Sequence, residues 1–337
     1  MKEIKQINDI SILYFFNSQV LIRTEKNGLI TDDGQLILSG KNITTISSIL
    51  YSFNYIFIQH IRFDEIYIYT LTGEFVKLIN SGFHLHIKKI DNKHYIANRN
   101  TKSFWEIDDK LNLTNTNKYV QFNTVLNNNI IHNTSTFIKC YKNLDGELKW
   151  EVKIENFGRN IAKDPKTGEV LWDKPNEIKE ALLADDKNIY VPLTGGQLLA
   201  LDAKTGEKVW MFDNEKLGKY QILDDKIYKG DGKSIIVYDK NNLKIEKKLY
   251  FKDVPILKNY IPAGPFLVYN DIIISTDVLY GKICLLNRQT LEVEEFFSLD
   301  KKLVNSKDAI IWNDNKLYVL DIDHTLHIFE KTSNETT

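Results

Sequence analysis

A strand–turn–strand unit recurs along this chain of 337 residues, and its clearest copy spans Gly196–Asp213. Within it, Leu198–Asp202 shows the two-residue periodicity of a strand. The segment Asp202–Gly206 predicts a tight turn, because Asp accepts hydrogen bonds from nearby backbone N–H groups and Gly adopts the positive φ that a bulged hairpin requires. A second alternating strand begins at Glu207. One hairpin cannot bury its apolar face alone, so the number and spacing of its copies decide the fold.

Seven further turns of this kind follow strand-like segments elsewhere in the chain. They lie at Asp32–Gln35, Leu71–Glu74, Asp108–Lys110, Leu144–Glu147, Asn241–Asn242, Gln289–Thr290 and Lys331–Thr332. Most are separated by about 35–50 residues, which is the period of four-stranded propeller blades. We therefore predict an all-β fold, a β-propeller of eight four-stranded antiparallel blades, with seven blades as the alternative.

The two ends of the chain indicate how the propeller closes. The last unit reaches Thr337 without a fourth strand, and Glu3–Ile7 is a strand-like segment that belongs to no unit. We expect the N-terminal strand to join the last blade, because closure removes the exposed sheet edge that an open array leaves. Residues 1–337 then form a single propeller domain.

The turn sequences resemble a known family. Asp202–Trp210 matches the Asp-x-x-Thr-Gly-x-x-x-Trp signature of the PQQ-like β-propeller repeat, Asp164–Trp172 matches its turn half, and Asp145–Trp150 matches it in part. The resemblance implies that the Trp packs between neighbouring blades and that the Gly turn closes the outer hairpin. It assigns these structural roles to Trp150, Trp210, Gly146 and Gly206.

The family includes quinoprotein alcohol dehydrogenases and the lipoprotein of the outer-membrane β-barrel assembly machine. The enzymes commonly carry a vicinal Cys pair, a calcium site and a catalytic Asp, whereas the two cysteines here, Cys140 and Cys284, lie far apart. We therefore expect neither quinone nor calcium as a cofactor, and we assign no catalytic residue. The lipoprotein is nearer in length, but its signal and lipidated Cys are missing, so a periplasmic assembly scaffold is kept only as an alternative.

Composition narrows the partners and the compartment. The net charge is −1, so no long-range field attracts nucleic acid or an anionic membrane, and neither is expected as a partner. Two distant cysteines exclude a disulfide framework and favour a reducing compartment. The sequence shows no signal peptide, lipidation cysteine or membrane-spanning window. We predict a cytoplasmic protein.

Two of the connections that follow a fourth strand are long. The first, Ile154–Ile178, accounts for the 60 positions between Gly146 and Gly206, where the repeat predicts about 40. We expect residues 155–178 of this connection to form an inserted hairpin rather than a ninth blade. The second connection is Lys252–Gly264, which has three prolines at or beside it.

Both long connections should rise from the same face of the propeller. Long ordered loops on a rigid frame often carry recognition, so we predict that this face binds another protein. The aromatic, Arg and apolar side chains suited to such a surface are Phe157, Arg159, Trp172, Tyr260 and Ile261.

Other candidate sites are weaker. His84 and His86 share one face of a predicted strand, as metal ligands can, but no third ligand is visible nearby. His324 and His327 span a turn, and we predict no metal site. Two functions stay open: a non-catalytic protein-binding propeller, for example a bacterial immunity protein that neutralises a toxin, and a hydrolase or lyase with its site in the central channel.

Overall fold

The protein is an eight-bladed β-propeller whose blades are four-stranded antiparallel sheets. The computed structural model describes residues 1–16, 19–24, 28–33, 35–38, 46–60, 65–79, 83–90, 93–98, 103–116, 118, 124–126, 129–142, 144, 146–212 and 218–331. The fold class and the blade number predicted from the turns are confirmed. None of the helices in the described ranges is long and apolar enough to cross a membrane.

The chain divides into two compact units, and we describe each by itself. The first unit comprises residues 1–81, 226–239 and 244–337. Its strands are β1 (Lys2–Ile7), β2 (Ile10–Phe16), β3 (Gln19–Thr24), β4 (Gly28–Thr31), β5 (Leu36–Leu38), β6 (Ile46–Ser52), β7 (Tyr55–His60), β8 (Ile66–Thr70), β9 (Phe75–Ile79), β25 (Lys226–Gly230), β26 (Ser234–Asp239), β27 (Ile245–Tyr250), β28 (Phe266–Val268), β29 (Ile272–Asp277), β30 (Lys282–Asn287), β31 (Val293–Ser298), β32 (Ile310–Asn313), β33 (Lys316–Leu320) and β34 (Leu326–Glu330). Its 3₁₀ turns are η3 (Phe251–Asp253), η4 (Pro255–Leu257) and η5 (Lys307–Ala309).

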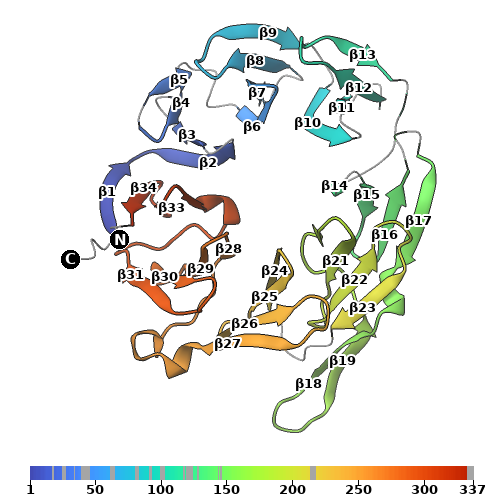
Figure 1. Ribbon diagram of the computed structural model, residues 1–337, viewed down its shortest axis with the longest axis vertical. Coiled ribbons are helices and arrows are strands. Elements are labelled where there is room, and N and C mark those ends of the chain that lie inside the picture. The colour runs from blue at the N-terminus through green and yellow to red at the C-terminus, as the bar shows by residue number, and fades with distance from the viewer. Residues whose placement is uncertain are drawn as a thin grey trace. The chain divides into compact units, whose positions relative to one another are not determined.

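The second unit comprises residues 82–225 and 240–243. Its elements are β10 (Phe83–Ile90), β11 (Lys93–Asn98), β12 (Ser103–Ile107), β13 (Leu113–Asn115), β14 (Thr124–Leu126), β15 (Asn129–Asn133), β16 (Phe137–Tyr141), β17 (Leu148–Lys153), η2 (Ile154–Asn156), β18 (Arg159–Lys163), β19 (Val170–Pro175), β20 (Leu183–Ala184), β21 (Asn188–Pro192), β22 (Leu198–Asp202), β23 (Lys208–Phe212) and β24 (Lys219–Leu223). Each sheet takes four consecutive strands, as the ribbon in Figure 1 shows, except the last sheet and the pair β18–β19.

The last sheet has the order β1-β34-β33-β32, so its outer strand comes from the N-terminus. Strand β1 runs antiparallel to β34, with Lys2 opposite Glu330 and Ile7 opposite Leu326. The Glu3 carboxylate accepts a hydrogen bond from His327 Nδ1, with 2.7 Å between Glu3 Oε1 and His327 Nδ1. The predicted pairing of the N-terminal strand with the last blade is therefore confirmed.

The core follows the inner strands of each sheet. Leu198, Leu199 and Leu201 on β22 are fully buried, because both faces of a central strand are covered when neighbouring sheets stack. The outer strand β27, in contrast, is exposed along most of its length. Exposure to solvent thus increases from the inner strands to the outer strand of a sheet. This explains why the inner strands are continuous apolar runs while the outer strands carry most of the charge.

The turn before each outer strand is the recurring local structure. The Asp202 carboxylate accepts the backbone N–H groups of Lys204 and Thr205, both at 2.8 Å. These bonds lower the pKa of Asp202, with the bond from Thr205 contributing most. Gly206 has a φ of +74° and donates its N–H to the Asp202 carbonyl at 2.8 Å. Gly146, with a φ of +81°, takes the same left-handed conformation in the preceding sheet.

Trp150 joins the fourth and fifth sheets at this turn. Its ring is buried, and its Nε1 donates to the Ala203 carbonyl at 3.3 Å. A Cβ placed on Gly206 would lie 2.6 Å from the indole Cδ2, so the ring requires glycine beneath it. Trp210 holds the same position on the next outer strand, half-buried, with its ring 5.8 Å from that of Tyr190.

Asp185 links the fifth sheet to the turn at Lys240. Its carboxylate accepts hydrogen bonds from Lys240 Nζ at 2.7 Å and Tyr190 Oη at 2.5 Å. Two backbone N–H groups, of Lys187 and Asn188, complete the set. Burial alone would raise the pKa of Asp185, but these bonds outweigh it and lower the pKa to about 2.

Replacing Gly206 by Ala should destabilise the protein through both backbone strain and contact with the indole. We expect Gly206→Ala to reduce the free energy of unfolding by about 2–4 kcal/mol. Gly168→Ala is the matched control, because Gly168 has a φ of +76° with nothing within 4 Å of its Cβ position; it should cost about 1 kcal/mol. Urea unfolding of both variants measures the difference, and equal losses would show that the Trp150 contact is unimportant.

Asp185→Asn should lower stability in a pH-dependent way. Because the folded-state pKa is depressed, the stabilisation is complete at neutral pH and is lost as pH falls from about 4 to about 2. At pH 7 we expect a loss of about 1–2 kcal/mol, kept small by solvent screening of the pair. Unfolding at a series of pH values should show the two proteins converging below this window, and a constant difference would exclude the ion pair as the cause.

Candidate protein-binding site

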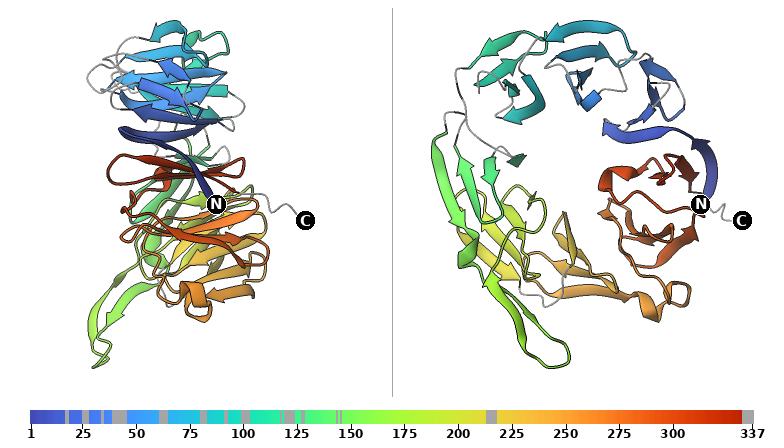
Figure 2. Two further views of the ribbon diagram at one scale, coloured as in Figure 1. Left: turned by 90° about the vertical axis from the view of Figure 1, so that its left-hand side faces the viewer. Right: turned by 180° about the vertical axis from the view of Figure 1, so that it is seen from behind.

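The strands β18 and β19 form a two-stranded hairpin between the fourth and fifth sheets in the chain. They pair antiparallel from Arg159 opposite Pro175 to Lys163 opposite Val170. The hairpin extends away from the sheets of its own unit, as both views in Figure 2 show. Its projection makes it the most distinctive surface feature of that unit.

The sequence forms this hairpin with the same turn that the blades use. The Asp164 carboxylate accepts the N–H groups of Lys166 at 2.7 Å and Thr167 at 2.9 Å. Gly168 takes the left-handed conformation and donates its N–H to the Asp164 carbonyl. Hydrogen bonds from the backbone N–H groups, that of Thr167 first, lower the pKa of Asp164 and keep it ionised in the turn.

Large apolar side chains on the hairpin face solvent. Their exposed fractions are 51% for Ile161, 57% for Val170, 58% for Leu171 and 50% for Trp172. An isolated two-stranded hairpin is only marginally stable in water, so polar contacts are needed to keep this hairpin folded. Arg159 forms an ion pair with Asp173, which crosses the hairpin near its root. The arrangement leaves exposed apolar side chains on both strands of a hairpin that is held in shape.

The root of the hairpin is fixed to its unit by Asn176, which is 1% exposed. Its Nδ2 donates to the Phe157 carbonyl at 2.8 Å and to Gln197 Oε1 at 3.1 Å. Its Oδ1 accepts the N–H of Gly195 at 2.9 Å. The backbone N–H of Ile178 also donates to the Ser135 carbonyl at 2.7 Å, so the root contacts both adjoining sheets.

Phe157 and Arg159, both predicted as partner-binding residues, lie in different surroundings. Phe157 is partly buried and packs against the core of β15, β16, β21 and β22, because η2 turns the chain inward at Ile154–Asn156. It anchors the root rather than forming an exposed contact. Arg159 is exposed, and its guanidinium forms an ion pair with Asp173.

Tyr260 was predicted to bind the partner, but the structure buries its side chain. Its side chain is 4% exposed and its ring lies edge-on between Phe251, at 5.2 Å, and Phe296, at 5.4 Å. Its hydroxyl donates to Ser275 Oγ at 3.1 Å, and burial raises its pKa. The turns η3 and η4 fold this connection back onto the sheet. Ile261, in contrast, is 67% exposed.

The two long connections belong to different units. Their placement on one face of the propeller stays a prediction. Sequence reasoning missed Ile161, Val170 and Leu171 as surface residues. The available signal was that apolar residues occupy adjacent positions in Val170–Trp172, which puts them on both faces of a strand that has no sheet beside it in the predicted repeat.

The remaining candidates do not add a second site. The side chains of His84 and His86 lie outside the described residues. His327 is buried between Asp321 and Glu3, and His324 Nδ1 lies 3.1 Å from the Ile10 carbonyl. Across the described part of the chain, no group of three or more His, Cys, Asp and Glu could hold a metal ion.

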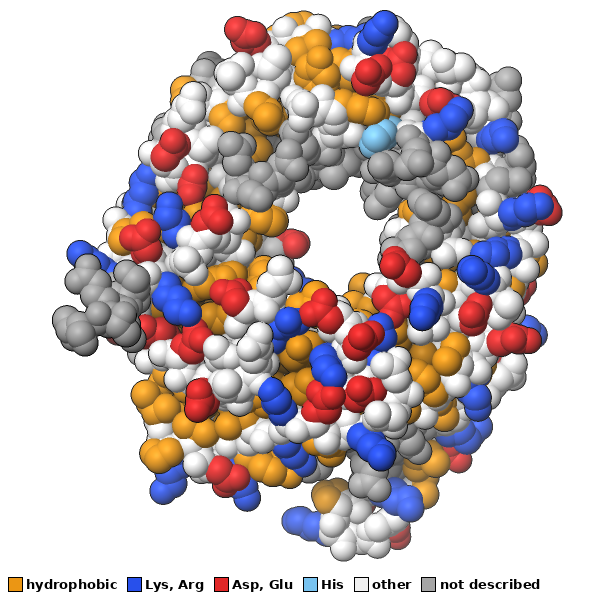
Figure 3. All heavy atoms as spheres, in the orientation of Figure 1, with side chains coloured by type: hydrophobic (Ala, Val, Ile, Leu, Met, Phe, Trp, Pro, Cys, Tyr) orange, Lys and Arg blue, Asp and Glu red, His pale blue; other side chains and the backbone are white. Residues whose placement is uncertain are grey.

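Charge does not single out one part of the face that Figure 3 shows. On the face seen in Figure 3, Lys and Arg side chains are interspersed with Asp and Glu side chains, and neither sign gathers into one continuous patch. This fits the net charge of −1.

Comparison with known proteins supports the fold. Residues 138–243 match the family model described as outer membrane protein assembly factor BamB, which is consistent with the PQQ-like β-propeller family and confirms the resemblance seen in the turn motifs. A search of curated proteins finds no match.

Solved structures resemble the chain over its whole length. BamB from Moraxella catarrhalis is 11% identical with a TM-score of 0.59, and the match covers 99% of both chains. Sqt1 from Saccharomyces cerevisiae is 11% identical with a TM-score of 0.59, covering 99% of this chain and 100% of that one. The computationally designed Ika8 protein is 12% identical with a TM-score of 0.56, covering 98% and 100%. At these identities the likeness shows the fold alone.

Asn176→Ala should loosen the hairpin root, because it leaves the Gly195 N–H and the Phe157 carbonyl without their partner. We expect hydrogen exchange across residues 157–178 to accelerate by about tenfold or more, corresponding to about 1–3 kcal/mol of lost local stability. Asn156→Ala, at an exposed position of the same connection, is the control and should leave exchange unchanged. Identical exchange in both variants would show that Asn176 does not hold the root.

Proposed function

We propose that the protein is a non-catalytic β-propeller that binds another protein through the hairpin β18–β19. The proposal rests on one observation above all: apolar side chains that are half or more exposed stand on a segment with a fixed root. Exposed apolar groups on an ordered projecting element mark interaction sites. A preorganised hairpin also loses less entropy on binding than a flexible loop does.

Leu171 and Trp172 are the proposed contact residues. Both belong to β19, where the register of the hairpin shifts and Leu171 is the extra residue beside Trp172. A concave partner surface, such as a cleft, would enclose the strand pair and cover both side chains. Trp contributes a large contact area at low entropy cost and is enriched among residues that dominate binding energy.

A specific form of this function is a bacterial immunity protein that neutralises a toxin. A rigid hairpin inserted into an active-site cleft would exclude substrate sterically, without any chemistry from the propeller. The net charge of −1 is compatible with a protein partner of either sign. The immunity function can be tested directly by adding the purified protein to the product of a toxin-like neighbouring gene and measuring the activity of that product.

An assembly scaffold is the second candidate. It is favoured by the family model matched over residues 138–243, whose description is an outer membrane protein assembly factor. Under this alternative the hairpin would hold a client protein rather than block an enzyme. The two candidates share the same contact residues and differ in what happens to the bound protein.

Affinity capture from a lysate of the source organism tests the site. We expect the double variant Leu171→Ala and Trp172→Ala to recover at least about tenfold less of any specific partner than the wild type does. The matched control is Leu279→Ala with Tyr280→Ala, an exposed apolar pair at 58% and 69%. This control should recover as much partner as the wild type.

Thermal unfolding must show that all three proteins remain folded. Equal recovery by the hairpin variant and the wild type would remove the hairpin from the binding site. Loss with both double variants would show that the capture reports general surface hydrophobicity and not this site.

A further inference from the structure

The two edges of the hairpin β18–β19 differ in what they leave open to a further strand. The outer edge of β19 is closed at three points. Pro175 has no N–H group, the Asp173 carbonyl accepts Arg159 Nη2 at 3.1 Å, and Leu171 is the extra residue of a register shift. Each of these features hinders pairing, so no strand is expected to add beside β19.

The outer edge of β18 lacks these obstructions. At its two ends, the Gly158 carbonyl accepts the N–H of Asn176 at 3.4 Å, and the Asp164 N–H donates across the turn at 2.8 Å. Backbone groups of a strand alternate between its two edges, so Ile161 and Lys163 direct theirs away from β19. In the described part of the chain, the sheet ends at β18 on this side.

The open part of this edge begins just beyond the root of the hairpin. A Cβ on Gly195 would lie 2.9 Å from the Arg159 carbonyl oxygen, so the neighbouring loop covers the edge at that residue. Ile161 and Lys163 lie further out, and each offers an outward N–H group and a carbonyl. An extended chain pairs with groups at this spacing, which is how a strand is added to a sheet.

The side chains along this edge indicate the chemistry of the added strand. Ile161, which is 51% exposed, and Lys163 share one face of β18. On the other face, Trp172 Nε1 donates to Asn160 Oδ1 at 3.4 Å, so the indole extends towards β18, on the same face as Ala162. Lys163 is exposed, and within the described residues its ammonium has no carboxylate within ion-pair distance. An added strand would cover Ile161 and pair with Lys163.

A second copy of this chain is a poor occupant of the edge. Two-fold symmetry would pair the two β18 strands antiparallel, and in the register centred on Ile161 each Arg159 would face Lys163 of the other copy. Like charges directly opposite each other destabilise a sheet, whereas an acidic residue opposite Lys163 stabilises it. The edge therefore favours a different protein whose segment carries such a residue.

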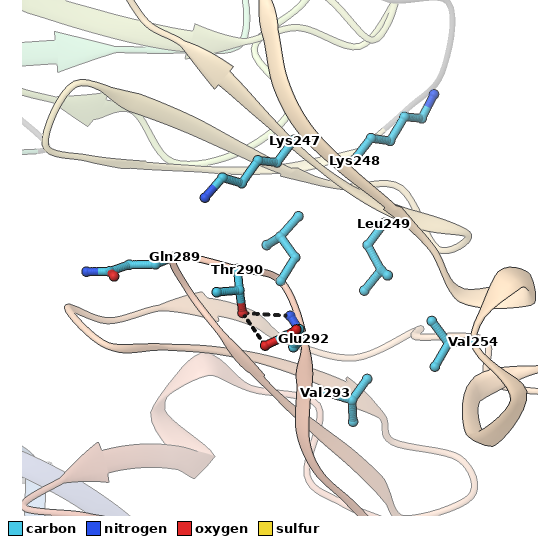
Figure 4. A pocket seen from close by; sticks show the side chains of 9 residues that line it. Lys247, Lys248, Leu249, Val254, Gln289, Thr290, Glu292 and Val293 are labelled. Atoms are coloured by element: carbon cyan, nitrogen blue, oxygen red, sulfur yellow. Dashed lines mark hydrogen bonds between the residues drawn. The ribbon is translucent and has the colours of Figure 1, made fainter.

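The groove between β27 and the turn before β31 does not specify a partner in this way. It has a volume of about 650 Å³, and Leu249, Val254 and Val293 are directed into it (Figure 4). Lys247 and Glu292 also line it. These opposite charges favour neither an acidic nor a basic occupant.

We propose that the outer edge of β18 binds an extended segment of the partner protein as a third, antiparallel strand. The segment carries an apolar side chain opposite Ile161 and an acidic one opposite Lys163. The proposal rests on the function proposed for the hairpin and names the part of the partner that the hairpin holds. Backbone hydrogen bonds supply the affinity, and the two side chains select the sequence.

The probe is the peptide acetyl-Thr-Glu-Val-Val-Thr-amide, titrated into isotope-labelled protein. In antiparallel pairing its Glu lies opposite Lys163 and its second Val opposite Ile161. We expect the amide resonances of Ile161 and Lys163 to shift and to saturate below about 10 mM peptide. N-methylation of the second Val removes a backbone donor and should weaken binding by about tenfold or more. No saturation by about 10 mM, or equal binding of the N-methylated peptide, overturns the proposal.

Variants of the protein locate the binding. Ile161→Pro removes an outward N–H and spares the bonds to β19, so it should weaken binding by about tenfold or more. Ile161→Val keeps that N–H and is the matched control, which should bind within about twofold of the wild type. Lys163→Glu should weaken binding, and a peptide with Lys in place of Glu should recover it. Equal binding by the wild type and Ile161→Pro, with unchanged thermal midpoints, would exclude this edge.

The outcomes separate this proposal from the function on which it rests. If the peptide fails while the Leu171→Ala and Trp172→Ala double variant still loses its captured partner, the hairpin binds through side chains alone and the strand pairing is wrong. If the double variant keeps its partner as well, the hairpin function also fails. A wild-type dimer in sedimentation that Ile161→Pro abolishes would make a second copy the occupant and overturn the proposal.

Discussion

The contact between an outer strand and the next turn is the interaction on which the packing of the fourth and fifth sheets depends. The turn has a fixed backbone, in which an Asp or Asn side chain accepts two N–H groups and a residue four positions on is left-handed. Because the backbone is fixed, the side chain at the left-handed position decides what can lie above it. Glycine at 206 admits the Trp150 ring, because a Cβ at that position would lie 2.6 Å from the indole Cδ2. Local turn chemistry and packing between sheets are therefore set by the same residue.

The number of blades could be predicted from the sequence because each turn is a local structure. Five residues with an Asx side chain at one end and Gly or a substitute at the other specify the turn without help from distant contacts. The role of Glu3–Ile7 followed from counting, since the last unit lacked one strand. The interior of the Lys252–Gly264 connection was not predictable in this way. Its prolines suggest an exposed loop, but η3 and η4 fold it inward and place Tyr260 between two Phe rings.

The candidate site was predictable only in outline. The duplicated turn at Asp164 indicated a hairpin, and the exposure of Trp172 follows from a strand pair with no third strand to cover it. The role of Asn176 was hidden, because an asparagine at a strand end does not indicate which backbone groups it will bond. Its partners, the Phe157 carbonyl and the Gly195 N–H, come from segments 19 positions away on either side.

The way the hairpin root is held affects how the sequence of the hairpin surface can evolve. Asn176 and the backbone of residues 157–158 and 194–195 hold the root, and none of these contacts involves the side chains from Ile161 to Trp172. Substitutions among these exposed side chains therefore escape the constraint that core packing imposes elsewhere in the chain. A lineage could diversify its choice of partner there while the eight sheets remain as they are.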